Sequence, residues 1–306
     1  MKILFGPVSS RRFGRSLGID LSPSKKQCNF DCVYCELDPK KAQEKQDEII
    51  SIDKIISEVK VMLEKNVEFD FLTLTANGEP SLYPYLNELI LSLRSIAKDK
   101  KLLILSNGTA VLDEDKFNAL LKLDVVKFSL DSAVAKTFYR IDRALKNIDL
   151  EKMIEKMADF RARFNGDLIM EILVVKDLND NEEEFEALNQ ALKKIMPLRV
   201  DLSTIDRPPA YAVKKVSEEK LLELSKLIDS TPVLLAKRHY EGEKLSFNEE
   251  ELLKMLHLRS QSEIDIEVKF DEQSKTLLNQ LIKEKKVKIL DLAGVKFVRG
   301  ILKKNM

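Results

Sequence analysis

The sequence contains few of the residues that build disulfide frameworks or zinc sites. It has three cysteines, two histidines and no tryptophan in 306 residues. All three cysteines, Cys28, Cys32 and Cys35, lie within one short window. An odd number of closely spaced cysteines excludes a disulfide framework and predicts a metal site. Zinc remains an alternative only if folding brings His239 or His257 back to this window.

Long apolar runs and an excess of one charge are also missing. No segment approaches the roughly 18 uninterrupted apolar residues of a membrane span. The N-terminal residues 1–17 carry three arginines and no long apolar stretch, so they do not resemble a secretory signal. Lys plus Arg equals Asp plus Glu, at 51 each, and net charge therefore favours no class of partner. We predict a cytoplasmic protein without a membrane contact.

Short apolar runs alternate with helix-like segments through the first two thirds of the chain. Such alternation predicts parallel strands joined by crossover helices, with the strands covered on both faces. The pattern alone does not distinguish a barrel from an open doubly wound sheet. The expected strands cover residues 16–21, 71–75, 102–105, 125–130, 168–175 and 200–205.

The character of the sequence changes near residue 240, which predicts a larger domain over 1–240 and a smaller one over 241–306. Helical segments are expected at 249–258, 262–268 and 272–285, followed by a hairpin from 287–289 and 295–298. Three helices and a two-stranded wing predict a winged-helix-like domain. Its last part, 273–306, has nine Lys or Arg and two Asp or Glu, with Lys296 and Arg299 on the wing. This basic surface predicts contact with nucleic acid, although such modules also pack against their own enzyme or dimerise.

Three cysteine thiolates suit a [4Fe-4S] cluster better than a zinc ion. A [4Fe-4S] cube offers four iron corners, and three cysteines leave one iron open. An open iron can take a ligand from a substrate, which is a catalytic arrangement. We therefore predict Cys28, Cys32 and Cys35 as metal ligands and catalytic residues.

The spacing C-x-x-x-C-x-x-C, with Tyr34 before the last cysteine, resembles the signature of the radical S-adenosylmethionine (SAM) superfamily. The resemblance implies an α/β fold built as a partial (β/α)6 barrel of the TIM type. It also implies a cluster whose open iron chelates SAM and splits it to a 5′-deoxyadenosyl radical, with an electron donor such as flavodoxin or ferredoxin. Tyr34 holds the position whose backbone meets the adenine of SAM in that family.

Further motifs follow predicted strands in the order that the superfamily shows. Asn77-Gly78-Glu79-Pro80 is similar to the glycine–glutamate motif that receives the SAM amine, Ser106-Asn107-Gly108 to a strand-end motif, and Ser129-Leu130-Asp131 to a fourth-strand motif that approaches SAM. Taken together, the resemblance implies these cofactor-binding residues: Tyr34, Asn77, Gly78, Glu79, Asn107, Ser129 and Asp131. Lys176, at the end of a strand, is a candidate catalytic lysine for substrate binding or a Schiff base.

The N-terminal stretch 6–18 and Val174-Val175-Lys176-Asp177 resemble an uncharacterised branch grouped with the wyosine-synthetase-like proteins, whose tricyclic-base enzyme modifies a tRNA guanosine. Two departures separate this chain from that enzyme: no cysteine is left for a second cluster, and position 177 is Asp rather than Gly. We predict a single-cluster radical SAM enzyme acting on RNA, with tRNA as the expected substrate. One alternative is a protein or small-metabolite substrate. The other is an iron–sulfur winged-helix redox regulator, in which the Gly78-Glu79 motif has no role.

Overall fold

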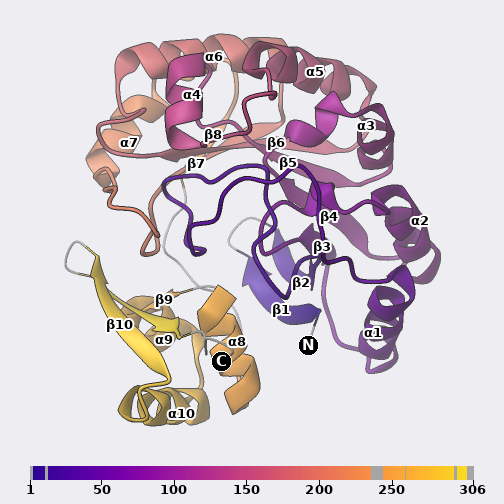
Figure 1. Cartoon of the computed structure of the whole chain (residues 1–306), viewed down its shortest axis with the longest axis vertical. Coiled ribbons are helices and arrows are strands. Elements are labelled where there is room, and N and C mark those ends of the chain that lie inside the picture. Colours follow the sequence, from indigo (N-terminus) through magenta and orange to yellow (C-terminus); the bar gives the residue numbers. More distant parts are fainter. Residues whose placement is uncertain (1–2, 11–12, 236–243, 259, 293–294, 302–306) are drawn as a thin grey trace.

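The computed structural model of the chain describes residues 3–10, 13–235, 244–258, 260–292 and 295–301. Its larger part is an eight-stranded sheet whose strands follow one another in sequence order. The first pair is antiparallel and all later pairs are parallel. The sheet curves into an open arc (Figure 1). Its strands are β1 (Leu4–Ser10), β2 (Gly14–Asp20), β3 (Phe71–Thr75), β4 (Lys101–Ser106), β5 (Val125–Ser129), β6 (Asp167–Val174), β7 (Arg199–Thr204) and β8 (Val233–Leu235).

Helices cover the outer side of this arc (Figure 1). They are α1 (Ile52–Glu64), α2 (Leu86–Ile96), α3 (Glu114–Leu120), α4 (Ala135–Ile141), α5 (Leu150–Arg163), α6 (Glu182–Ile195) and α7 (Glu218–Ser225). Local sequence sets where several begin, because the side chains of Ser51, Asp149 and Asn181 accept a backbone N–H in the first turn of α1, α5 and α6. These caps fix the crossover connections between neighbouring parallel strands.

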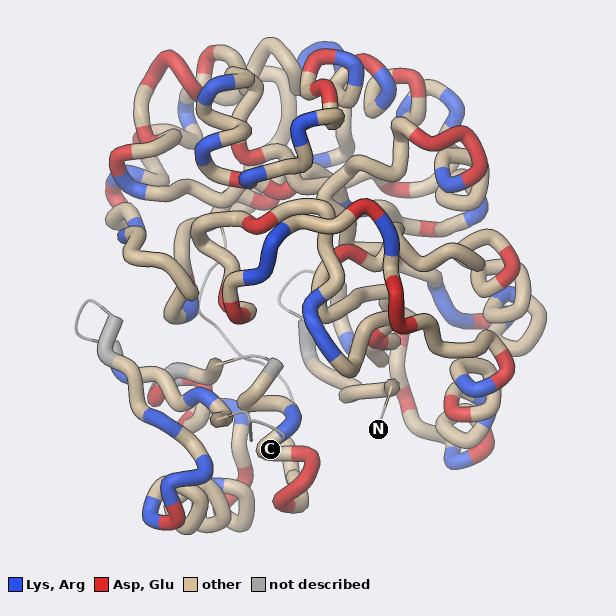
Figure 2. Tube along the Cα trace, in the orientation of Figure 1, with Lys and Arg blue, Asp and Glu red and all other residues tan. Residues whose placement is uncertain are grey.

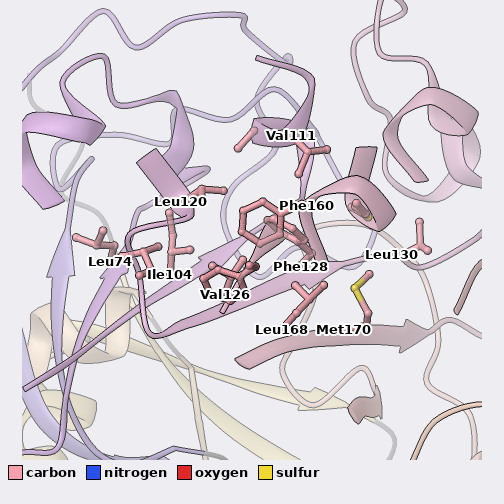
Figure 3. Packing of buried hydrophobic residues seen from close by; sticks show 14 of the residues in the cluster. Leu74, Ile104, Val111, Leu120, Val126, Phe128, Leu130, Phe160, Leu168 and Met170 are labelled. Atoms are coloured by element: carbon pink, nitrogen blue, oxygen red, sulfur yellow. The ribbon is translucent and has the colours of Figure 1, made fainter. Parts of the chain in front are cut away.

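The main hydrophobic core lies between the sheet and these helices (Figure 3). Alternate residues of each strand face it, such as Val126 and Phe128 of β5, which are completely buried. The Phe128 ring packs edge-on against Phe160 of α5, with centroids 5.5 Å apart. Lys127 and Ser129, which alternate with Val126 and Phe128 along β5, therefore point into the arc.

The predicted α/β class and its parallel strands are confirmed, and each expected strand is present with its ends shifted by at most two residues. Strands β1 and β8 were not predicted. β8 has only three residues, and β1 contains Pro7, which lacks an N–H and lies where the pairing register shifts between Phe5 and Val8. Helices α4 and α7 were also not predicted, and the N-cap residue of α4, Val134, makes no side-chain cap.

A smaller C-terminal module, residues 244–301, lies on the open side of the arc (Figure 1). It contains a three-stranded antiparallel sheet in the order β10-β11-β9 and a small core around Leu252, Phe270 and Leu281. The predicted helices and hairpin are present, and the short strand β9 is an addition. The predicted boundary at residues 240 and 241 lies outside the described residues. The elements are α8 (Glu249–Leu258), β9 (Gln261–Ser262), α9 (Glu263–Lys269), α10 (Glu272–Lys283), β10 (Val287–Leu292) and β11 (Val295–Gly300).

Candidate active site

The cysteines lie in a long irregular segment, residues 21–51, which we call the cluster loop and which joins β2 to α1. The buried side chain of Gln27 ties the two ends of this loop together. Its Nε2 donates to Ser22 Oγ at 2.8 Å and to the Glu48 carbonyl at 3.0 Å, and its Oε1 accepts from the Asp47 N–H at 2.8 Å. The cluster loop is therefore ordered without regular secondary structure.

Backbone contacts join the cluster loop to the end of β3 at Gly78. The Gln27 N–H donates to the Asn77 carbonyl and the Glu79 N–H donates to the Gln27 carbonyl, each at 2.9 Å. Gly78 has φ of 141°, and a Cβ there would lie 2.0 Å from the Gln27 carbonyl oxygen. Only glycine permits this approach, which places the Gly78-Glu79 motif directly beside Cys28.

The three cysteines line one cavity of about 180 Å³ at the carboxyl edge of the parallel strands. Among the described residues, no three His, Cys, Asp or Glu side chains converge on a point where they could hold a single metal ion. Three thiols around one cavity suit a cluster, in which each cysteine would bind a different iron. Burial raises the pKa of all three thiols. Coordination to iron removes the thiol proton and offsets the charge of the buried thiolates, so the donor set suits a [4Fe-4S] cluster.

Four of the residues predicted to bind the cofactor line the same cavity: Gly78, Glu79, Asn107 and Ser129. Glu79 is buried, and its Oε1 accepts from the Ser81 N–H at 2.9 Å and from Ser106 Oγ at 2.8 Å. Its Oε2 accepts from the Asn107 N–H at 2.7 Å. The Glu79 carboxylate thus links the ends of β3 and β4, and a carboxylate with four lone-pair sites can still accept a donor from the cavity.

Three other predicted residues lie next to the cavity rather than in its lining. The Tyr34 hydroxyl donates to Asp131, whose other oxygen accepts from the Leu173 N–H at 2.7 Å. Burial raises the pKa of Asp131, to about 6. The Asn77 N–H donates to Asp20 Oδ1 at 3.0 Å. The Asn77 side-chain oxygen is buried with no hydrogen-bond partner among the described residues. These contacts support the walls of the site.

Lys176 is exposed and is not among the residues that line the cavity. It follows β6, where its backbone N–H donates to the Lys214 carbonyl. A neutral nucleophilic lysine requires burial, and this position does not provide it. The geometry therefore gives no support to a catalytic role for Lys176.

Three polar residues of the cavity were not identified from sequence: Lys26, Lys127 and Glu171. Two of them carried a signal. Lys127 precedes Ser129 by two residues and so shares its face of the strand. Glu171 is a charged residue in the middle of an otherwise apolar strand.

The C-terminal module contacts the cluster loop just after Cys35. Arg299 of β11 is 7% exposed, and its Nη2 lies 3.3 Å from Asp38 Oδ1. Arg207, which follows β7, donates through Nε to the Ser260 carbonyl at 2.8 Å and lies 3.5 Å from Glu36 Oε2. Arg299 therefore faces the cluster loop, and its expected place on an exposed basic surface is wrong.

We expect Arg299→Leu to loosen this contact and to expose the cluster. Asp38 is largely exposed, so the ion pair is worth about 1 kcal/mol, and cluster loss to a chelator should accelerate about fivefold. Absorbance decay of the reconstituted protein in EDTA measures the rate. Lys296→Leu on the same strand, which removes an exposed lysine 3.7 Å from Glu263, is the matched control. Equal decay in both variants would show that the module does not protect the cluster.

Comparison with known proteins identifies the family. The profile described as the radical SAM superfamily matches residues 23–188, which is more than half of the chain. The chain belongs to the radical SAM superfamily. Enzymes of this superfamily use a [4Fe-4S] cluster and SAM, so the predicted family, enzyme class and cofactors are confirmed.

Individual relatives agree with the family at the level of sequence and fold. A UPF0026 protein of Helicobacter pylori (strain J99) is 40% identical over 300 residues, covering 97% of each chain. A radical SAM methyltransferase from Sphaerobacter thermophilus shares the fold at 13% identity, with a TM-score of 0.57 over 74% of this chain and 67% of that one. An archaeal TYW1 aligns at 15% identity and a TM-score of 0.47 over 71% of this chain and 72% of that one. Within the described residues of this radical SAM protein, no helix is long and apolar enough to cross a membrane.

Proposed function

We propose that this radical SAM enzyme cleaves SAM reductively at a [4Fe-4S] cluster held by Cys28, Cys32 and Cys35, and that it modifies RNA, with tRNA as the substrate. The observation that carries the proposal is the shared cavity, because the three thiols and the polar residues at the ends of β3, β4 and β5 meet there. The cytoplasm, with flavodoxin or ferredoxin as electron donor, is the setting we propose for this chemistry.

Each group in the cavity has a role that follows from its position. The three thiolates would hold the cluster, and an iron without a protein ligand would be available to SAM. When bound, the cluster and SAM supply the one-electron cleavage that starts the reaction. Glu79, Asn107 and Ser129 lie at adjacent strand ends, where they can hold the polar groups of SAM in a fixed orientation.

The C-terminal module supports an RNA substrate. Its order of helix, strand, two helices and two strands is that of a winged-helix-like domain, the identity we propose for it. Basic residues gather at the end of α10 and the start of β10 (Figure 2). Three exposed lysines there, Lys283, Lys285 and Lys288, are placed to contact phosphates.

Part of the basic charge in the module is already compensated. Lys275 lies 2.9 Å from Glu267, Lys286 lies 2.6 Å from Glu249, and Lys296 lies 3.7 Å from Glu263. This compensation favours the second candidate, the same radical chemistry on a protein or a small metabolite. The regulator alternative leaves the cavity contacts of Glu79 and Asn107 without a role, and we do not pursue it.

The test is RNA-stimulated SAM cleavage by anaerobically reconstituted enzyme. With dithionite and SAM, we expect 5′-deoxyadenosine and methionine, and unfractionated tRNA from cells lacking the enzyme should raise their rate of formation. The triple substitution of Lys283, Lys285 and Lys288 by Gln should weaken tRNA binding about tenfold and reduce the salt slope by about two. Lys54, Lys60 and Lys65, exposed on or next to α1, supply the matched triple Gln control.

Two results would contradict the RNA substrate. One is equal tRNA stimulation in the two triple variants, which would show that these lysines do not bind RNA. The other is stimulation by a small-molecule extract and not by tRNA, which would establish the second candidate.

A further inference from the structure

A row of charged side chains crosses the inner face of the arc below the cysteines. Glu171 of β6 pairs in register with Ser129 of β5 on one side and with Asp201 of β7 on the other. Lys127 Nζ lies 2.7 Å from Glu171 Oε1 and 4.0 Å from Asp201 Oδ2. Asp201 is completely buried and accepts from Arg199 Nε at 2.8 Å. Lysine and arginine cations thus alternate with carboxylates inside the sheet.

Stability alone does not explain these charges. A buried ion pair loses about as much by desolvation as it gains by attraction, and apolar side chains of similar size stabilise equally well. Apolar side chains fill a neighbouring part of the same inner face, where Leu103, Val125 and Ile169 form a cluster. Charged groups placed among apolar neighbours and beside a reactive site are typical of binding residues.

Lys127 and Glu171 line the same cavity as the thiols, and Glu171 is level with Ser129 in the sheet. Lys127 precedes Ser129 by two residues, which places it about 7 Å closer to the amino end of the strand, away from the strand ends that carry the cofactor-binding residues. The Lys127 side chain is 6% exposed and that of Glu171 is 25% exposed. The pair therefore presents one hydrogen-bond donor and one acceptor side by side in the cavity.

We propose that Lys127 and Glu171 bind the substrate of the radical reaction through an amide-type edge, in which a hydrogen-bond acceptor faces the ammonium and an N–H donor faces the carboxylate. A nucleobase extruded from RNA has such an edge, and so does a small lactam or carboxamide. The assignment rests on the proposed function and adds to it the chemical class of the group that enters the cavity. Lys127 supplies the donor, and Asp201 remains close enough to balance its charge when a ligand meets Glu171.

The test measures the ratio of 5′-deoxyadenosine formation with and without a probe. The probes are total RNA and a small-molecule extract, both from cells lacking the enzyme. We expect one of them to raise the ratio in the wild type, and Glu171→Gln and Lys127→Met to lower the stimulated part at least about tenfold, because each leaves a substrate group unpaired. Glu171→Asp, which retains a carboxylate, should recover part of the stimulation and raise KM more than it lowers kcat.

A matched control neutralises a carboxylate outside the cavity. Asp229 lies 3.0 Å from Lys193 at the helix side of the sheet, and Asp229→Asn should keep the wild-type ratio. Stimulation by RNA would indicate that Lys127 and Glu171 bind a nucleobase, and stimulation by the extract would indicate that they bind a small amide. Wild-type ratios in both Glu171→Gln and Lys127→Met, or no stimulation of the wild type by either probe, overturn the proposal. If the wild type forms no 5′-deoxyadenosine under any condition, the proposed SAM cleavage itself is refuted, which is distinct from a failure of the substrate-binding proposal.

Discussion

Cys32→Ala protein, reconstituted anaerobically with iron and sulfide, is expected to lose its brown colour and more than about 99% of its SAM cleavage. Cys32 lines the cavity together with Cys28 and Cys35, and the chain has no fourth cysteine to replace it. Its Sγ lies 3.3 Å from Asp142 Oδ1, so the thiol is also held in one orientation. Iron content, the absorbance near 400 nm and 5′-deoxyadenosine measured by chromatography together report the loss.

Val33→Ala is the matched control for this substitution. Val33 is buried beside Cys32, and its N–H donates to the Ile141 carbonyl, a bond that the substitution keeps. The loss of two methyl groups should lower the free energy of unfolding by about 2 kcal/mol and leave the cluster in place. A Cys32→Ala protein that binds four irons and cleaves SAM would refute the cysteine assignment, whereas loss of iron from both variants would indicate a general effect on folding.

The strands and the cluster ligands could be predicted because their signals are local. Apolar runs of strand length between helix-like segments mark β3 and β6 without knowledge of the tertiary structure. The spacing of Cys28, Cys32 and Cys35 indicates shared chemistry on its own, and Glu79 follows a strand end, where functional groups of parallel sheets gather. Each of these inferences needs only residues close in sequence.

The rest of the site depends on contacts between distant segments. Cys32 meets Asp142 across 110 residues, and Arg299 meets Asp38 across 261 residues. No local pattern indicates that Arg299 is buried, since its neighbours read as an exposed basic hairpin. Lys176 was expected at the end of a strand, and it does follow β6 closely. The turn after β6 exposes its side chain to solvent, which its sequence neighbours do not reveal.

Glu79→Ala is expected to keep the cluster but to weaken SAM binding about 100-fold, which corresponds to about 2.7 kcal/mol. The substitution removes the acceptor of three hydrogen bonds, from Ser81, Ser106 and Asn107, and leaves these donors buried. The free energy of unfolding should also fall, by about 3 kcal/mol. Equilibrium dialysis with radiolabelled SAM measures binding to the reconstituted protein, and urea denaturation of the cluster-free protein measures stability.

Two further variants separate binding by Glu79 from its structural role. In Glu79→Gln the amide has one oxygen, so it can keep the bonds at Oε1 or the bond at Oε2 but not both, and the Kd for SAM should rise about tenfold. Glu184 is likewise buried and accepts from Ser132 Oγ at 2.6 Å, but it lies on α6 outside the cavity lining. Glu184→Ala should therefore reduce stability by a similar amount and leave SAM binding at the wild-type level. If SAM affinity fell equally in Glu79→Ala and Glu184→Ala, the loss would follow from stability alone, and Glu79 would have no direct part in holding SAM.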